Sequence, residues 1–95
     1  MSASTTYIVK RQGKRPTEAF KAEKLHASIV AVCLSVQAPI GQAEATASSV
    51  CNEVTVWLDE KPEVTSEDLR RKAAIVLEKY HQDAAHLYKH HHMVI

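Results

Sequence analysis

Residues 25–36, LHASIVAVCLSV, decide the fold class that this sequence predicts. The apolar side chains that return every three or four residues in this stretch are Leu25, Ile29, Val32 or Cys33, and Val36. This spacing is that of one face of an α-helix. We expect the helix to begin at Ala22 and to end before Pro39, because proline lacks the backbone N–H that a helix interior needs.

Three further helices are expected from the same periodicity. The second runs from about Gly41 to near Asp59, with an apolar face of Ala43, Ala47, Val50, Val54 and Trp57. The third begins at the Thr-Ser pair of residues 65–66, a typical helix cap followed by two acids, and its apolar face is Leu69, Ala73, Val76 or Leu77, and Tyr80. The fourth begins near Gln82 and buries Ala85, Leu87 and Tyr88.

Strands are expected on the N-terminal side of these helices. Residues 6–11 alternate as a half-buried strand does, residues 12–17 contain Gly13 and Pro16 and form a turn, and residues 18–20 return as a second strand. Glu63-Val64 is a candidate third strand. The sequence therefore predicts an α+β fold, in which a small N-terminal β-hairpin or three-stranded sheet caps a four-helix bundle.

Composition excludes several classes of site. The chain has 95 residues, enough for one small domain, with 2 Gly and 2 Cys. Gly13 and Gly41 are isolated, so neither a phosphate-binding P-loop nor a dinucleotide fingerprint is present. Neither cysteine belongs to a Cys-x-x-Cys pair, and both are expected to stay reduced. The longest apolar run, residues 29–34, is too short to span a membrane, and we expect a cytoplasmic protein without membrane contact.

Charge is unevenly distributed along the chain, although the formal net charge is only +1. Residues 1–24 carry six Lys or Arg against two Glu, whereas residues 25–63 carry one Lys against five acids. A basic end on a nearly neutral protein suggests a compact anionic ligand, since affinity for a long polyanion grows with the number of phosphates neutralised. A solvated basic hairpin is the alternative explanation.

Several short motifs occur in an order that resembles the ATP-cone, a regulatory domain of ribonucleotide reductase large subunits. They are VKRQG (9–13), EAF (18–20), EKL (23–25), VTSEDLR (64–70) and AHLYK (85–89). The sequence departs from the family pattern at Gln12, where an acid is usual. The resemblance covers residues 7–91, which leaves residues 1–6 as a flexible N-terminus and residues 92–95 as a tail.

The resemblance implies a function and its ligands. ATP or dATP binds such a domain, with Mg²⁺ bridging the phosphates, and regulates without being hydrolysed, so no enzyme activity is expected. The signal passes through assembly of a homo-oligomer or through a protein partner such as ribonucleotide reductase, and DNA is involved only indirectly, as in the family's transcriptional regulators. The nucleotide-binding residues that the resemblance implies are Ile8, Lys10, Arg11, Glu18, Lys21, Lys24, Leu25, Ser66, Arg70 and Lys89.

The residues themselves support part of this site. Strand alternation places Ile8 and Lys10 on one face about 6–7 Å apart, which suits a base beside a phosphate, whereas Arg11 would face away. Lys24 lies at the start of a helix, where the helix dipole favours an anion.

Several site residues have a structural alternative to ligand binding. Glu18 can form an ion pair within the hairpin, Lys21 can be a solvated lysine and Leu25 a core residue. Ser66 can cap the third helix, and Arg70 can pair with a neighbouring acid on that helix.

Two other functions compete with nucleotide binding. One is a small nucleic-acid-binding module that uses the basic hairpin, and the other is a helical protein-interaction domain whose site is degenerate. The C-terminal histidines raise a separate question, because His86 and His90 have the i, i+4 spacing that can hold a metal ion. We assign no metal site from the sequence and interpret these histidines as a basic tail sensitive to pH.

Overall fold

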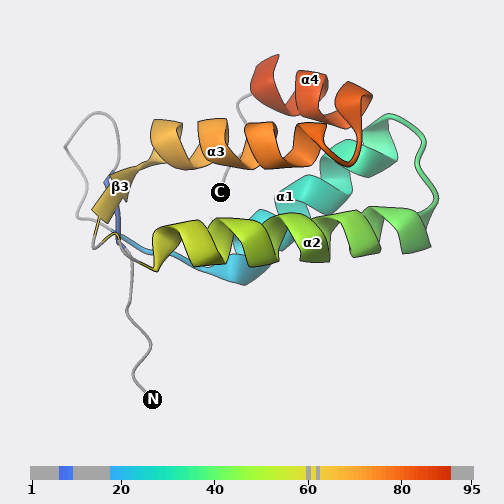
Figure 1. Ribbon diagram of the computed structural model, residues 1–95. Helices are drawn as coiled ribbons and strands as arrows, with labels where there is room; N and C mark the ends of the chain where they lie inside the picture. The colour runs from blue at the N-terminus through green and yellow to red at the C-terminus, as the bar shows by residue number, and fades with distance from the viewer. Residues whose placement is uncertain (1–6, 10–17, 60, 62, 91–95) are drawn as a thin grey trace.

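The computed structural model describes residues 7–9, 18–59, 61 and 63–90, with side chains from Phe20 onward. Its helices are α1 (Ala22–Ser35), α2 (Ile40–Leu58), α3 (Ser66–Glu78) and α4 (Gln82–His90) (Figure 1). All four predicted helices are confirmed, with ends within about two residues of those expected except at the end of α1. The predicted turn over residues 12–17 and the predicted terminal segments lie outside the described residues.

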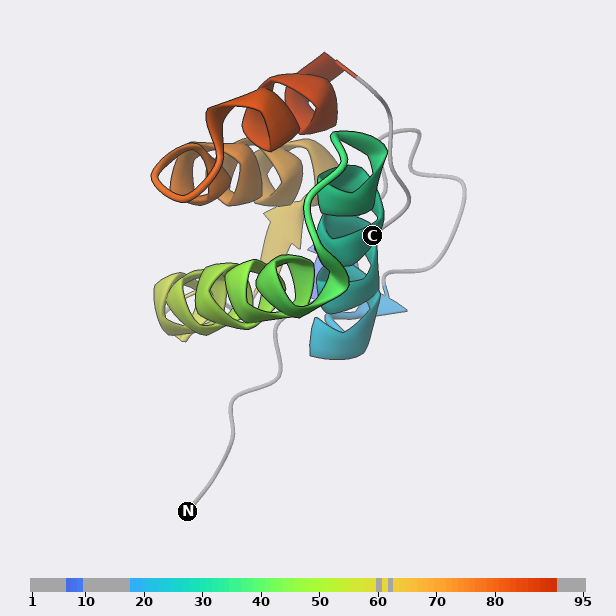
Figure 2. The same ribbon diagram turned by 90° about the vertical axis from the view of Figure 1, so that its right-hand side faces the viewer.

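The four helices contact one another in a closed ring. The largest interfaces join α1 to α2 and α3 to α4, and smaller ones join α2 to α3 and α1 to α4. In Figure 1, α3 runs alongside α2 and α4 lies over α3. Figure 2 shows α1 along one side of the bundle, from beside α2 toward α4. None of the helices in the described part of the chain combines the length and apolar character needed to cross a membrane.

The strands correct the predicted fold class. β1 (Tyr7–Val9), β2 (Glu18–Ala19) and β3 (Glu63–Thr65) hold three, two and three residues, against 14, 19, 13 and 9 in the helices. They pair in the order β2-β1-β3, antiparallel and then parallel. The prediction of an α+β fold with a sheet cap is wrong, because strands this short span only about 7–10 Å and cannot form a layer over the bundle. The described chain is a mainly helical four-helix protein.

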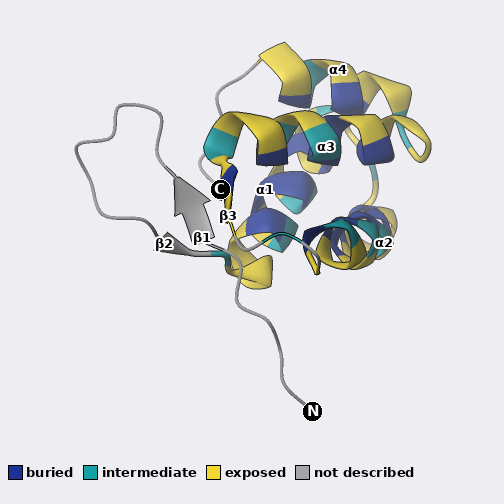
Figure 3. Cartoon of the chain, turned by 60° about the vertical axis from the view of Figure 1, so that its left-hand side comes forward, coloured by how far each residue is buried: buried dark blue, intermediate teal, exposed yellow. Residues whose placement is uncertain are grey.

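The core lies between the four helices, as the inward-facing buried residues in Figure 3 show. The predicted apolar faces of α1 and α2 are buried for the most part. On α3, the buried residues of the predicted face are Leu69, Ala73, Val76 and Leu77. Four predicted core residues are not fully buried, and two of them, Val36 and Leu87, are half-buried. Trp57 is half-buried at the core's edge, and Tyr80 is 44% exposed because α3 ends at Glu78, after which the helical spacing no longer applies.

A turn at Gln37, and not Pro39 as predicted, ends α1. Gln37 adopts φ 69°, and its N–H donates to Leu34 while that of Ala38 donates to Cys33, at 2.9 and 3.0 Å. These two bonds form a Schellman motif, which satisfies carbonyl groups at the end of a helix. Pro39 lies beyond this turn and instead precedes α2, where its carbonyl accepts from the Ala43 N–H.

The start of α3 is fixed by Thr65. Its Oγ1 accepts a hydrogen bond from the Asp68 N–H at 3.0 Å, so Thr65 is the N-cap and Ser66 is the first helical residue. We expect Thr65→Ala to lower the free energy of unfolding by about 1 kcal/mol. Urea denaturation measures this change, with Ser66→Ala as the matched control. A larger loss in Ser66→Ala than in Thr65→Ala would contradict this assignment of the cap.

Candidate anion-binding groove

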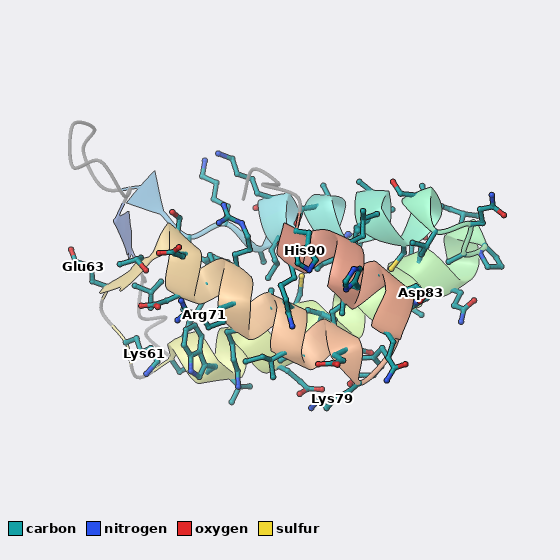
Figure 4. All side chains as sticks on the ribbon, turned by 90° about the horizontal axis from the view of Figure 1, so that it is seen from above. Lys61, Glu63, Arg71, Lys79, Asp83 and His90 are labelled. Atoms are coloured by element: carbon teal, nitrogen blue, oxygen red, sulfur yellow. The ribbon has the colours of Figure 1, made fainter. Side chains whose placement is uncertain are left out.

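A groove of about 420 Å³ lies where α3 meets the end of α4. Five of its lining residues come from α3 and one from α4: Glu67, Arg70, Arg71, Ala74, Ile75 and Lys89. Figure 4 shows α3 and α4 side by side, with Arg71 on α3 and His90 at the end of α4. Arg70 and Lys89 were both predicted as site residues, and the structure brings them together.

The α3 side of the groove is one stripe of the helix. Its residues follow each other at i, i+3, i+4, i+7 and i+8, the spacing of a single helical face. Sequence reasoning missed Glu67, Arg71, Ala74 and Ile75 as lining residues. The signal that could have found them is this second stripe, which lies beside the apolar face and mixes charge with aliphatic surface.

The charged side chains of the lining are mainly basic, with three cations and one carboxylate. Arg70 is half-buried, whereas Arg71 and Lys89 are exposed. The Nη1 atom of Arg71 lies 3.2 Å from Oδ1 of Asp68, and both side chains are solvent-exposed. An exposed pair of this kind is weak, so it leaves the Arg71 guanidinium able to bind an anion.

A buried tyrosine anchors the α4 side of the groove. The Tyr88 side chain is fully buried, and its hydroxyl lies 3.1 Å from Ser28 Oγ on α1. Because Ser28 donates its only proton to the Leu25 carbonyl at 2.8 Å, Tyr88 is the donor in this pair. This contact fixes α4 against α1 and sets the position of Lys89, the next residue.

The charge of Arg70 also affects the pKa of Tyr88. Burial raises the pKa of Tyr88 to about 12, while the positive charge of Arg70 acts in the opposite direction. The Arg70 guanidinium is therefore near enough to the buried ring for its charge to act on the Tyr88 hydroxyl. Tyr88 thus lies near Arg70 of α3 and directly precedes Lys89 of α4.

The start of α1 carries the next two predicted residues. Lys21 and Lys24 are both exposed, and the Lys21 carbonyl accepts from the Lys24 N–H at 3.1 Å. Neither lines the groove, but Lys24 lies one turn before Ser28, which contacts Tyr88. Leu25 is completely buried in the core, so its role is the structural one that was the alternative to ligand binding.

The remaining predicted residues lie in the strands, at the start of α3, or outside the description. The backbone of Ile8 pairs with Glu18 on one side and with Val64 on the other. Ser66 is half-buried in the first turn of α3 and does not line the groove. Lys10 and Arg11 lie outside the described residues, so their predicted roles stay predictions.

A second, more open hollow of about 300 Å³ lies between α1 and α2. It is lined by Ala22, Glu23, His26, Ser48, Cys51 and Asn52. The Cys51 thiol lies 3.8 Å from the Ala22 carbonyl, and burial raises its pKa to about 11. The thiol therefore stays protonated at neutral pH and is a poor nucleophile. Cys33 and Cys51 are both free thiols, as predicted.

Among the described residues, no group of three or more His, Cys, Asp or Glu side chains could hold a metal ion. Comparisons with protein-family models, with curated proteins and with solved structures give no match.

Proposed function

We propose that this chain is a regulatory nucleotide-binding domain of the ATP-cone type, which binds ATP or dATP without hydrolysing it. The observation that carries the proposal is the meeting of Arg70, Arg71 and Lys89 around one groove. Two of these three cations, Arg70 and Lys89, are residues that the motif resemblance implies, and they come from two consecutive helices, α3 and α4.

The groove has the chemistry that a nucleotide needs. Arginine offers a planar fork that matches phosphate oxygens, and lysine adds a compact positive charge. Ile75 adds aliphatic surface next to these cations and is 52% exposed, so a base or sugar can pack on it. The volume of about 420 Å³ lies within the range of roughly 300–1,000 Å³ typical of small-molecule sites.

The N-terminal residues complete the proposed site. Val9 pairs with Thr65, so the end of β1 lies beside the start of α3, the helix that carries most of the groove. Lys10 and Arg11 follow Val9 directly in the sequence. In the proposal they contact the polyphosphate, together with Lys21 and Lys24 at the start of α1, while Ile8 and Glu18 contact the nucleoside.

Magnesium fits this arrangement as an ion carried by the nucleotide. Mg²⁺ usually keeps several waters and binds one or two carboxylates plus phosphate oxygens. Glu67 supplies a carboxylate in the lining of the groove and would hold the ion there. Bound Mg²⁺ would neutralise part of the phosphate charge, and the cations of α3 and α4 would neutralise the rest.

The proposed output is a change in assembly. Nucleotide binding would link α3, α4 and the N-terminal strands and so favour one arrangement of the exposed surface. The domain would then act through its own oligomerisation or through a protein partner such as ribonucleotide reductase. Analytical ultracentrifugation with and without ATP tests the first of these routes.

A thermal-shift titration tests nucleotide binding. At about 100 times its dissociation constant, ATP should add about 2.7 kcal/mol to the free energy of unfolding, which raises Tm by roughly 10–20 °C for a domain of this size. We expect ATP and dATP to exceed GTP and inorganic triphosphate in this effect, with no phosphate released. Equal shifts with triphosphate would contradict a nucleotide site and indicate a general anion patch.

Three variants localise the effect. Lys89→Gln removes a groove cation and is expected to reduce the ATP-induced shift strongly, and Lys10→Ala should abolish it. Lys72→Gln is the matched control, because Lys72 lies on α3 but its Nζ is 5.8 Å from the Trp57 ring. No shift with any nucleotide, together with salt-sensitive binding to duplex DNA, would instead support the nucleic-acid-binding alternative.

A further inference from the structure

Two histidines lie one turn apart on the outer surface of α4. The ring centres of His86 and His90 are 4.5 Å apart and the rings are tilted by 56° to each other. Both side chains are exposed. Neither forms a hydrogen bond or ion pair with another described residue, so both imidazoles are available to an external ligand.

This separation suits one metal ion shared between the two rings. Zinc binds histidine nitrogen at about 2.0–2.1 Å, so two nitrogens on a tetrahedral ion lie about 3.3 Å apart. Rings with centres 4.5 Å apart can reach this distance by small rotations about their side-chain bonds. Imidazole is a ligand that suits zinc, nickel and copper.

The helix that carries the two histidines is held in place by its buried face. Ala84, Ala85 and Tyr88 are buried against the other helices, and His81 Nδ1 accepts from the Ala84 N–H at the start of α4. His81 is thus used as a cap, in contrast to His86 and His90. Because α4 is packed against the other helices, less conformational entropy is lost when a metal ion orders the two histidine side chains.

We propose that His86 and His90 form a binding site for a divalent transition-metal ion of the zinc class, with water in the remaining coordination positions. The site is separate from the proposed nucleotide function and does not depend on it. Binding would join residues one turn apart and stabilise the end of α4, which also carries Lys89.

The experiment must separate this pair from His91 and His92, which follow in the sequence. Zn²⁺ alone is titrated by calorimetry into the full chain carrying H91N and H92N. We expect one ion per chain to bind. Adding H86N or H90N to this background should weaken the affinity by at least about tenfold. The matched control is H26N, on α1, which should leave the affinity unchanged.

A second measurement keeps the test independent of calorimetry. Zn²⁺ should raise Tm of the H91N/H92N chain and should not raise that of the same chain with H86N added, while circular dichroism confirms that both are folded. Loss of all Zn²⁺ binding in H91N/H92N, or equal affinity with and without His86, would overturn the proposal.

Discussion

Tyr88→Ala is expected to lower the free energy of unfolding by about 3–5 kcal/mol, the usual cost of removing a fully buried aromatic ring. Tyr88 is among the largest side chains that the core buries completely, and it joins α4 to α1. A loss of 3 kcal/mol corresponds to a drop in Tm of about 12 °C or more in a domain of this size. Urea and thermal denaturation measure both quantities.

Tyr88→Phe is the matched control, because it keeps the ring and removes only the hydroxyl. The expected loss is about 0.5–1.5 kcal/mol, the net contribution of one hydrogen bond. Ser28 still donates to the Leu25 carbonyl in this variant, so no buried donor is left without a partner. A loss below 1 kcal/mol in Tyr88→Ala would contradict the role of Tyr88 as the anchor of α4.

High pH is the second condition with a large expected effect. The pKa of Tyr88 is about 12 in the folded protein, mainly because burial disfavours the phenolate, against an ordinary value of 10.0. The unfolded chain therefore loses this proton first. The stability linked to Tyr88 is fully present below about pH 10 and is lost as pH rises toward 12, a decrease of about 2–3 kcal/mol.

Urea denaturation at pH 9.5 and pH 12 measures this loss, with Tyr88→Phe again as the control. The pKa of Cys51 is also raised, so Cys51 contributes a decrease in the same direction, but it is present in both proteins. The difference between the two proteins isolates Tyr88. An equal loss of stability in both would show that Tyr88 titrates normally.

The helices could be predicted from the sequence because each buries a single periodic face. Leu25, Ile29, Val50 and Val54 are completely buried, as their spacing requires. The start of α3 was also predictable, since a hydroxyl residue followed by two acids favours a helix N-terminus. Helix existence depends on local patterns of this kind, which a sequence displays directly.

The fold class was not predictable in the same way. Alternation in residues 6–11 and 18–20 indicates strands but not their length, and β1 and β2 hold only three and two residues. The side chain of Tyr80 illustrates a second limit. It lies two residues beyond α3 and its hydroxyl donates to Glu53 on α2, a contact between residues far apart in the sequence.

The candidate site was predicted in part. Arg70 and Lys89 were identified by motif resemblance, and the structure places both in one groove. Arg71 and Ile75 were missed because they lie outside the buried apolar face of α3 and outside the family motifs. Finding them requires knowing where α4 packs on α3, which the sequence pattern of neither helix shows by itself.

The most direct test of the central claim is a nuclear magnetic resonance titration of the full chain with ATP and Mg²⁺, following backbone amide shifts. We expect the largest shifts at Arg70, Arg71, Ile75 and Lys89, with little change around Trp57 on α2. Saturating ATP that leaves those four amides unmoved would contradict a nucleotide site in this groove.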